Sequence, residues 1–232
     1  TPKELQVNLE ICSQNLLDSW ESLQMRAGAG APAPASFDDY LISHLAGRIS
    51  QGVENAIWAG NDLTGGSFTG LTTATVGRLV TDATVVDVAN VGGAATAFSA
   101  ANIIENLQNA TAAIPSNVYT KEDLYIYMSP KSYRLYISAI STLGYVNAYS
   151  MNGDYDAVFE GIKIAVCNGF ENDKLVCMEK SNGFFGTDLL SDSTNIQLLD
   201  MSGITGSQNI RLIARFTGGT QVGIGADVVL VS

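Results

Sequence analysis

The chain has 232 residues, of which 46% are hydrophobic and only 15% are charged, and its formal net charge at pH 7 is −11. This composition excludes intrinsic disorder, and the acidic balance argues against direct nucleic-acid recognition, which depends on clustered Lys and Arg. A surface with so few charges suits contact with copies of the same chain, and a monomer covered by neutral polar side chains is the alternative.

The N-terminal residues predict a half-buried strand. Residues 3–12 alternate strictly between apolar and polar side chains. The apolar face carries Leu5, Val7, Leu9 and Ile11. A short helix is expected over 13–24, and the Gly- and Pro-rich residues 26–35 predict an exposed loop.

The strongest helix signal runs from Phe37 to Ala59. Ser36 and Asp39 have the spacing of a capping box, and Gly60 is a stop signal. Apolar side chains recur at every fourth position, at Leu41, Leu45, Ile49, Val53 and Ile57. Such a helix extends about 35 Å, at 1.5 Å per residue.

Residues 60–97 are rich in Gly, Thr and Ala, and their alternating stretch 81–88 is too weak to place. A second helix is expected from a cap at Ser99 through Ile114, and Pro115 ends it. Its inward side chains are Ile103, Ile104, Leu107 and Ala110.

The remaining sequence predicts a strand, a third helix and then mainly strands. Asp123 to Met128 alternates as a strand, and Ser129-Pro130 opens a helix to about Leu143, with Ser as cap and Pro at the first helical position. The expected later strands are 162–166, 174–178, 195–199, 209–217 and, after a turn at Gly218-Gly219, 221–231. Helices between strands and a β-rich second half indicate an α+β fold.

The three cysteines predict neither a disulfide framework nor a zinc site, because Cys12, Cys167 and Cys177 are odd in number and form no C-x-x-C pair. Cys167 and Cys177 lie among apolar residues and are expected to be buried, reduced thiols, which fits folding in a reducing cytoplasm. No apolar run is long enough to span a membrane, and we expect no signal peptide. The first residue is Thr1, so we expect upstream residues to have been removed.

His44, the single histidine, is the residue that a Ser-His-Asp or Cys-His device would need. No nucleophile motif accompanies it, so a helix histidine with satisfied hydrogen bonds is the favoured interpretation. Residues 218–225 superficially resemble a phosphate loop but lack its Gly-Lys-Ser/Thr ending, which favours a hairpin turn.

An acidic segment has part of a calcium-loop pattern, with oxygen ligands at Asn152, Asp154 and Asp156. However, Ala157 and Lys163 occupy the positions that require Gly and Glu, so a solvated loop is favoured. The sequence therefore predicts no catalytic, cofactor-binding or metal-binding residues.

Six segments, taken in chain order, carry a family resemblance. They are Thr1 to Ser19, the helix Phe37 to Asn61 with its Gly60-Asn61-Asp62 ending, Tyr127-Met128-Ser129-Pro130, Phe159 to Ile164, Phe184 to Leu189, and Arg211 and Arg215 before the final apolar strand. In order and character, over nearly the whole chain, these segments resemble the major capsid proteins of tailed bacteriophages, the Johnson-fold family.

The resemblance implies a fold with a long spine helix, 37–59, within a peripheral domain, 1–70. An axial domain would follow over 71–181, residues 182–221 would return to the peripheral domain, and 222–232 would close the axial domain. The family's N-terminal arm and extended loop are expected to be absent, either cleaved or trimmed away.

The resemblance also implies a structural protein and not an enzyme, with no cofactor. Copies would associate head to tail into hexamers and pentamers of an icosahedral head that encloses DNA without specific recognition. Portal and scaffolding or protease proteins would be partners, without any membrane, in a virion assembled in the bacterial host cytoplasm. The alternatives are an encapsulin-like nanocompartment shell and a small-molecule-binding or hydrolytic domain that uses His44 or the 152–156 loop.

Overall fold

Segments from both ends of the sequence combine in each of two units. The computed structural model describes residues 2–12, 37–64, 66–93, 96–144, 157–187, 196–201, 205 and 209–232. Unit 1 comprises Thr1–Val53 and Gly186–Gly218, and unit 2 comprises Glu54–Phe185 and Gly219–Ser232. The boundary falls within two continuous elements, helix α2 (Phe37–Ala59) and strand β9 (Asn209–Val222).

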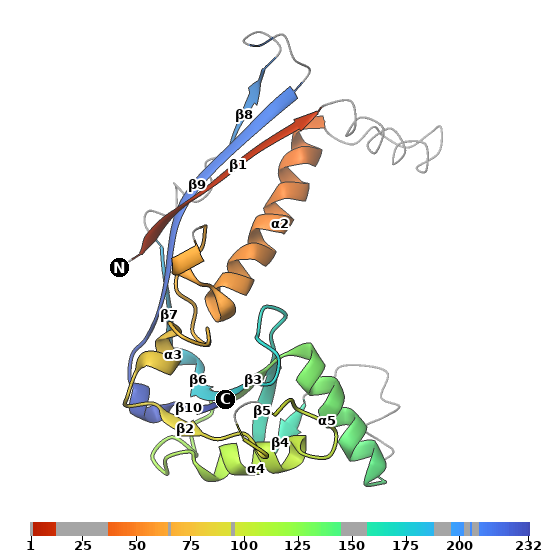
Figure 1. The fold of residues 1–232 in the computed structure, drawn as a ribbon, viewed down its shortest axis with the longest axis vertical. Coiled ribbons are helices and arrows are strands. Elements are labelled where there is room, and N and C mark those ends of the chain that lie inside the picture. Colours follow the sequence, from red (N-terminus) through yellow and green to blue (C-terminus); the bar gives the residue numbers. More distant parts are fainter. Residues whose placement is uncertain are drawn as a thin grey trace. The chain divides into compact units, whose positions relative to one another are not determined.

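A four-stranded sheet is built around β9 (Figure 1). Strand β1 (Lys3–Cys12) pairs with it antiparallel at every position, from Lys3 opposite Gly218 to Cys12 opposite Asn209. Strands β8 (Ile196–Asp200) and β7 (Gly183–Gly186) also pair with β9. Among the strands that the structure describes, β1 is therefore an outer strand of this sheet.

The core of unit 1 is small. Leu45 of α2 and Leu212 of β9 are buried, and Val7, Ile49 and Ile210 pack partly buried against them. This contact confirms the predicted apolar stripe of α2 at Leu45 and Ile49, and the burial of Leu5 and the partial burial of Val7 confirm that part of the predicted apolar face of β1.

A six-stranded sheet organises unit 2. Its order is β2 (Val86–Val88), β10 (Val229–Val231), β6 (Leu175–Glu179), β3 (Leu124–Met128), β5 (Ile162–Val166) and β4 (Val158–Phe159). The pairs β10–β2 and β3–β5 are parallel, and the other neighbours are antiparallel. The outer strands are short, with three residues in β2 and two in β4.

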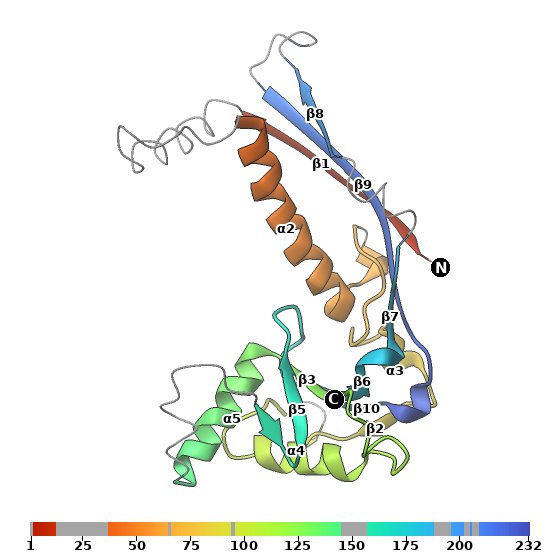
Figure 2. The ribbon, with the colours of Figure 1, turned by 180° about the vertical axis from the view of Figure 1, so that it is seen from behind.

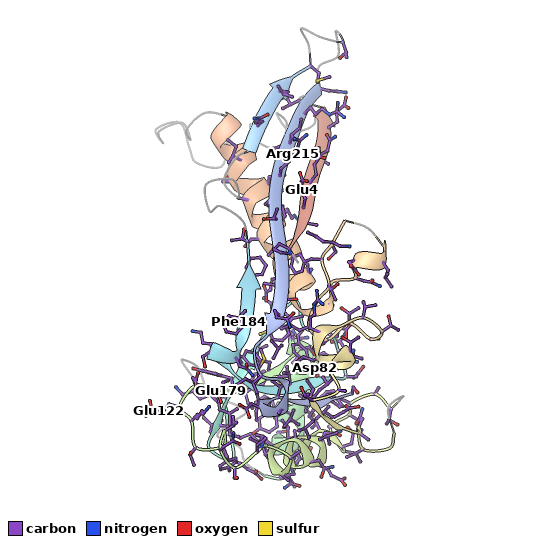
Figure 3. All side chains as sticks on the ribbon, turned by 90° about the vertical axis from the view of Figure 1, so that its left-hand side faces the viewer. Glu4, Asp82, Glu122, Glu179, Phe184 and Arg215 are labelled. Atoms are coloured by element: carbon purple, nitrogen blue, oxygen red, sulfur yellow. The ribbon has the colours of Figure 1, made fainter. Side chains whose placement is uncertain are left out.

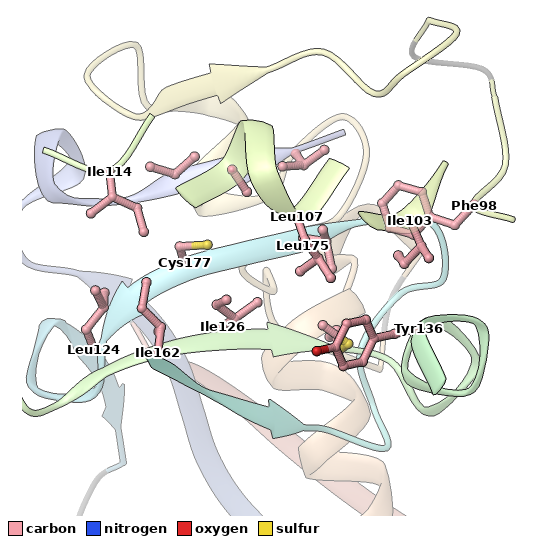
Figure 4. Packing of buried hydrophobic residues seen from close by; sticks show 14 of the residues in the cluster. Phe98, Ile103, Leu107, Ile114, Leu124, Ile126, Tyr136, Ile162, Leu175 and Cys177 are labelled. Carbon is pink, nitrogen blue, oxygen red and sulfur yellow. The ribbon is translucent and has the colours of Figure 1, made fainter. Parts of the chain in front are cut away.

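Both faces of this sheet are covered. Helices α4 (Ile103–Ala112) and α5 (Pro130–Thr142) pack on one face, where Leu107 meets Leu175 and Cys177 of β6 (Figure 4). The other face packs against a second cluster that contains Trp58, Val176 and other buried residues. Because β6 is buried on both faces, all of its residues are buried, and its sequence is a continuous Leu-Val-Cys-Met run.

Several predicted elements are confirmed. Helix α2 has the expected bounds, and β1 and β5 match their predicted ranges. The Ser129 hydroxyl caps α5 by accepting a hydrogen bond from the Ser132 N–H at 3.2 Å, and Pro130 occupies the first turn. In β3 the side chains of Leu124, Ile126 and Met128 alternate inward as predicted.

The predicted turn at Gly218-Gly219 is wrong, because β9 continues through both glycines to Val222. Gly218 lies opposite Lys3, so pairing with β1 holds this stretch extended. The chain turns later, through the 3-10 turn η5 (Gly225–Asp227), and the closing strand is the three-residue β10.

The predicted start of the second helix is also wrong. Helix α4 begins at Ile103, and the Ser99 side chain does not cap it. Instead, the Ser99 N–H donates to Asn102 Oδ1 at 2.7 Å, and the Ser99 carbonyl accepts from the Ile103 N–H at 3.0 Å. A short turn therefore precedes the helix.

The segment 60–97 contains short elements that the sequence did not place. They are η1 (Asp62–Thr64), α3 (Arg78–Thr81) and β2, and a further 3-10 turn, η3 (Lys180–Asn182), follows β6. The predictions for 13–24, 26–35, Ser36 and 152–156 lie outside the described residues. Within the described part of the chain, no helix has the length and apolarity needed to cross a bilayer.

Candidate assembly surfaces

His44 and residues 218–225, which were considered above for catalysis and phosphate binding, are far apart in the sequence. His44 lies on the exposed side of α2, and residues 218–225 form the end of β9 and the turn after it. Across the described ranges, no group of three or more His, Cys, Asp or Glu side chains is arranged to hold a metal ion.

The two described thiols are protonated at neutral pH. Burial raises the pKa of Cys177 to about 12 and, with a smaller contribution from the charge of Glu54, the pKa of Cys167 to about 11. A nucleophilic cysteine is a thiolate, so these environments favour packing over reaction.

A mixed-charge ladder covers the exposed face of β1 and β9. Glu10 lies directly opposite Arg211. Its Oε1 accepts a hydrogen bond from Asn209 Nδ2 at 2.8 Å, and Arg211 Nε donates to Asn8 Oδ1 at 2.9 Å. Arg215 is exposed further along the same face, opposite Gln6, and Figure 3 labels it together with Glu4 of β1. These cross-strand bonds hold β1 in a single register against β9.

The opposite face of β1 is only partly covered. Leu5 is buried and Val7 is half-buried, but 42% of Leu9 is exposed. Leu9 therefore stays partly exposed although it lies on the apolar face of β1.

Unit 2 has three large apolar side chains that are well exposed, Phe184, Phe185 and Ile224. Their exposed fractions are 57%, 45% and 58%. Phe185 packs against the buried Phe68, with ring centroids 5.9 Å apart. Phe184 and Phe185 are consecutive in β7 (Gly183–Gly186), so their side chains point to opposite faces of the strand, Phe185 toward Phe68 and Phe184 toward Gly223.

The buried Asn182 side chain holds the backbone of Ile224 in place. Its Nδ2 donates to the Ile224 carbonyl at 2.8 Å, and its Oδ1 accepts from the Ile224 N–H at 2.8 Å. A Cβ atom at Gly223 would lie 3.0 Å from the Phe184 ring. Asn182 therefore fixes the backbone at Ile224, and the Phe184 ring lies close to Gly223.

Two hydrogen-bonded pairs of polar side chains join β3 and β6 at one end of the six-stranded sheet. Lys121 Nζ lies 2.5 Å from Glu179 Oε1, and this hydrogen bond raises the pKa of Lys121. The Ser181 hydroxyl donates to Asp123 Oδ2 at 2.6 Å and lowers the pKa of that carboxyl. These two pairs link the start of β3 to the end of β6 and therefore stabilise the sheet.

Helix α5 lies beside β5 and β4, the last two strands in the order of the six-stranded sheet (Figure 2). The rings of Tyr136 and Phe159 meet edge to face at 5.9 Å, and the Tyr136 hydroxyl donates to the Val158 carbonyl at 3.4 Å. These contacts pack α5 against β4 at the edge of the sheet.

Comparison with known proteins rests on structure alone. No protein-family model and no curated protein matches the sequence. A chain of the satellite phage P4 procapsid matches with a TM-score of 0.61 and 13% identity, over 100% of this chain and 75% of its own length. A chain of the capsid of Myoviridae phage XM1 matches with a TM-score of 0.53 and 11% identity, over 99% and 72%.

The chain has the fold of the tailed-phage major capsid proteins. The capsid fold also matches a chain of the encapsulin complex from Synechococcus elongatus PCC 7942, with a TM-score of 0.59 and 9% identity, over 100% of this chain and 73% of that one. The predicted α+β class and the predicted capsid fold are confirmed.

The exposure of Phe184 and Phe185 and the position of β1 in its sheet could not be predicted from the sequence. Phe184 and Phe185 were noted only as part of a segment, since sequence cannot show that two adjacent phenylalanines are exposed. The alternation in β1 was visible, but its place at the edge of a sheet depends on pairing with residues some two hundred positions away.

Proposed function

We propose that this chain is a structural subunit of a phage capsid shell, without an enzymatic role. The observation that carries the proposal is the match of nearly its entire length to chains of a phage procapsid and a phage capsid. The exposed apolar side chains of unit 2 and the low charged fraction of 15% support the proposal, because both suit contact between copies.

Copies associate head to tail into rings, and rings of five and six build a closed shell. Such contacts join two different surfaces of the same chain, and they close when the rotation between neighbours divides a full circle. In this scheme unit 1 corresponds to the peripheral domain and unit 2 to the axial domain. The expected limits were 70/71, 181/182 and 221/222, and the units divide at 53/54, 185/186 and 218/219.

The shell encloses DNA without recognising it. The net charge of −11 supports this role, because an acidic wall repels phosphates and keeps a packed genome from adhering. Portal and scaffolding or protease proteins take part in assembly in the bacterial host cytoplasm, and the product resides in the virion.

Electron microscopy of the purified product of the complete gene tests the proposal. We expect rings or closed shells, with light scattering that rises steeply above a threshold concentration. A product that stays monomeric at high concentration contradicts it.

A nanocompartment shell is the second candidate, because a chain of an encapsulin complex shares the fold over all of this chain. The contents of shells purified from the native host separate the two functions. Encapsidated DNA, measured by absorbance and nuclease protection, favours the phage head, and a single enzyme identified by mass spectrometry favours the nanocompartment.

A further inference from the structure

Two Asn-Gly pairs lie in the described part of the chain, Asn168-Gly169 and Asn182-Gly183. Asn is thermolabile, and it is most reactive before Gly, which leaves the backbone free to rotate. In the reaction, the Gly nitrogen loses its proton and attacks the side-chain carbonyl carbon of Asn, and the side-chain nitrogen leaves as ammonia. Water then opens the cyclic imide to aspartate or isoaspartate.

The backbone of Asn168 lies in a turn. The Phe170 N–H donates to the Cys167 carbonyl at 3.2 Å, so Asn168 and Gly169 are the two central residues. Gly169 does not have a positive φ, which indicates a type I turn with a helical conformation at Asn168. That conformation rotates the Gly169 nitrogen away from the side chain of Asn168. Ring closure therefore requires the turn to open.

Glu54 of α2 holds this turn closed. Its Oε1 accepts hydrogen bonds from the Asn168 N–H at 3.0 Å and from the Gly169 N–H at 3.4 Å, and the second bond occupies the nitrogen that would attack. Gly169 also packs against the backbone of α2. A Cβ atom there would lie 2.6 Å from the Glu54 carbonyl oxygen and 2.7 Å from Asn55 Cα. The turn has no space to rotate while it is docked on the helix.

A different contact holds the second pair. Asn182 is the last residue of η3, and its side chain is buried. Both of its amide atoms are hydrogen-bonded to the Ile224 backbone at 2.8 Å, so attack on this side chain would break both bonds. This contact does not involve Glu54. Asn182 is therefore an internal reference for Asn168.

We propose that Asn168 is a latent deamidation site, which the docking of residues 167–170 on Glu54 keeps unreactive in the folded chain. Asn168 is exposed, so water reaches it and conformation supplies the protection. The reaction proceeds from molecules in which the turn has opened, and its rate measures how often the end of α2 releases the turn. The inference is independent of the proposed function.

The product makes the release of the turn permanent. Aspartate or isoaspartate at position 168 adds a carboxylate to the residue whose N–H binds Glu54, and like charges repel. Isoaspartate also adds a methylene group to the main chain, beside a glycine that is already in close contact with α2. Deamidation thus converts a transient opening of the turn into a lasting one.

Peptide mapping tests the protection. Trypsin places Asn168 on the peptide 164–174 and Asn182 on the peptide 181–211, and a third Asn-Gly pair of the sequence, Asn152-Gly153, falls on 135–163. The folded chain and the chain unfolded in guanidinium chloride are incubated in mildly alkaline buffer, and mass spectrometry follows aspartate and isoaspartate. We expect Asn168 and Asn182 to react at least about tenfold more slowly in the folded chain. Equal rates at Asn168 in the two states overturn the inference.

Substitution of Glu54 isolates the contact. Glu54→Ala removes the acceptor, and we expect deamidation of Asn168 to rise at least about tenfold while Asn182 reacts as slowly as in the unchanged chain. Glu54→Gln keeps an oxygen acceptor, so its rate at Asn168 should lie closer to that of the unchanged chain.

Three outcomes of this comparison overturn the inference. An unchanged rate at Asn168 in Glu54→Ala would show that Glu54 does not protect it. A rise at both Asn168 and Asn182 would show that global unfolding exposes them. A fall in both variants would assign Glu54 as the base that removes the Gly169 proton.

Asn168→Asp, which is one product of the reaction, tests the lasting release. We expect the Gly169 amide to exchange faster in Asn168→Asp than in Asn168→Ser, because the aspartate adds a negative charge next to the N–H groups that bind Glu54. Equal exchange in the two variants would contradict the inference.

Discussion

Close contacts between backbones determine where this fold requires glycine. A Cβ atom at Gly60 would lie 2.3 Å from the Phe68 carbonyl oxygen, and one at Gly169 would lie 2.6 Å from the Glu54 carbonyl oxygen. Gly60 was predicted as a helix stop, and α2 does end before it. Its φ is not positive, however, so the glycine is needed for space and not for a left-handed turn.

Gly60→Ala is expected to destabilise the protein by at least about 2 kcal/mol, because overpacked backbone must move. Gly47→Ala is the matched control within the same helix region. It has nothing within 4 Å of its Cβ position and lies on an exposed helix face. That change should add about 1 kcal/mol of stability through helix propensity. Urea unfolding measures both, and equal effects would contradict the assignment.

The buried thiols predict how stability depends on alkaline pH. Burial raises the pKa of Cys177 from 9.0 to about 12, so above pH 9 the unfolded chain loses a proton that the folded chain keeps. The free energy of unfolding therefore falls as pH rises from 9 toward 12. Burial also raises the pKa of Tyr127 to about 12, which adds to the loss above pH 10.

Cys177→Ala should show a shallower fall in unfolding free energy between pH 9 and 11 than the unchanged chain. Urea titrations at pH 8, 9, 10 and 11 give the slopes, and the absolute loss of stability at pH 8 serves as the baseline. Parallel slopes for the two proteins would show that the Cys177 thiol does not titrate in the expected window.

Local sequence signals predicted a helix or strand correctly where no pairing with a distant segment competed with them. Helix α5 carries its own cap at Ser129, and α2 has a four-residue apolar repeat, so both were predictable. The course of β9 through Gly218-Gly219 was not, because Lys3 holds that stretch extended from the other end of the sequence. The pairing of β1 with β9 could not be predicted for the same reason.

Ser129→Ala should weaken α5. The hydroxyl accepts from the Ser132 N–H and lies buried against the Ser132 hydroxyl at 3.1 Å, so its loss is expected to cost about 1–2 kcal/mol. Ser138→Ala, at an exposed position inside the same helix, should be neutral or slightly stabilising. Chemical denaturation compares them, and a neutral Ser129→Ala would refute the capping role.

At the scale of the whole molecule, charge opposes the association that the surfaces favour. Each copy carries a net charge of −11, so neighbouring copies repel one another. Salt screens this repulsion, with a Debye length of about 10 Å at 0.1 M. Burial of exposed apolar side chains such as Phe184 between copies would not be weakened by salt in this way.

Raising sodium chloride from 20 to 500 mM is therefore expected to lower the concentration at which copies associate, by roughly an order of magnitude. Light scattering over a protein dilution series measures the threshold. A threshold that rises with salt would show that attractive ion pairs, and not apolar surfaces, dominate the contacts.

The place of β10 in the six-stranded sheet determines how late in synthesis the sheet can close. Residues Val229–Val231 lie between β6 and β2, and β2 has no other neighbour in that sheet. While the ribosome is still adding these residues, β2 waits unpaired and one side of β6 stays uncovered. The sheet therefore closes only after residue 231 has left the exit tunnel, and a nascent chain released before that point cannot complete it.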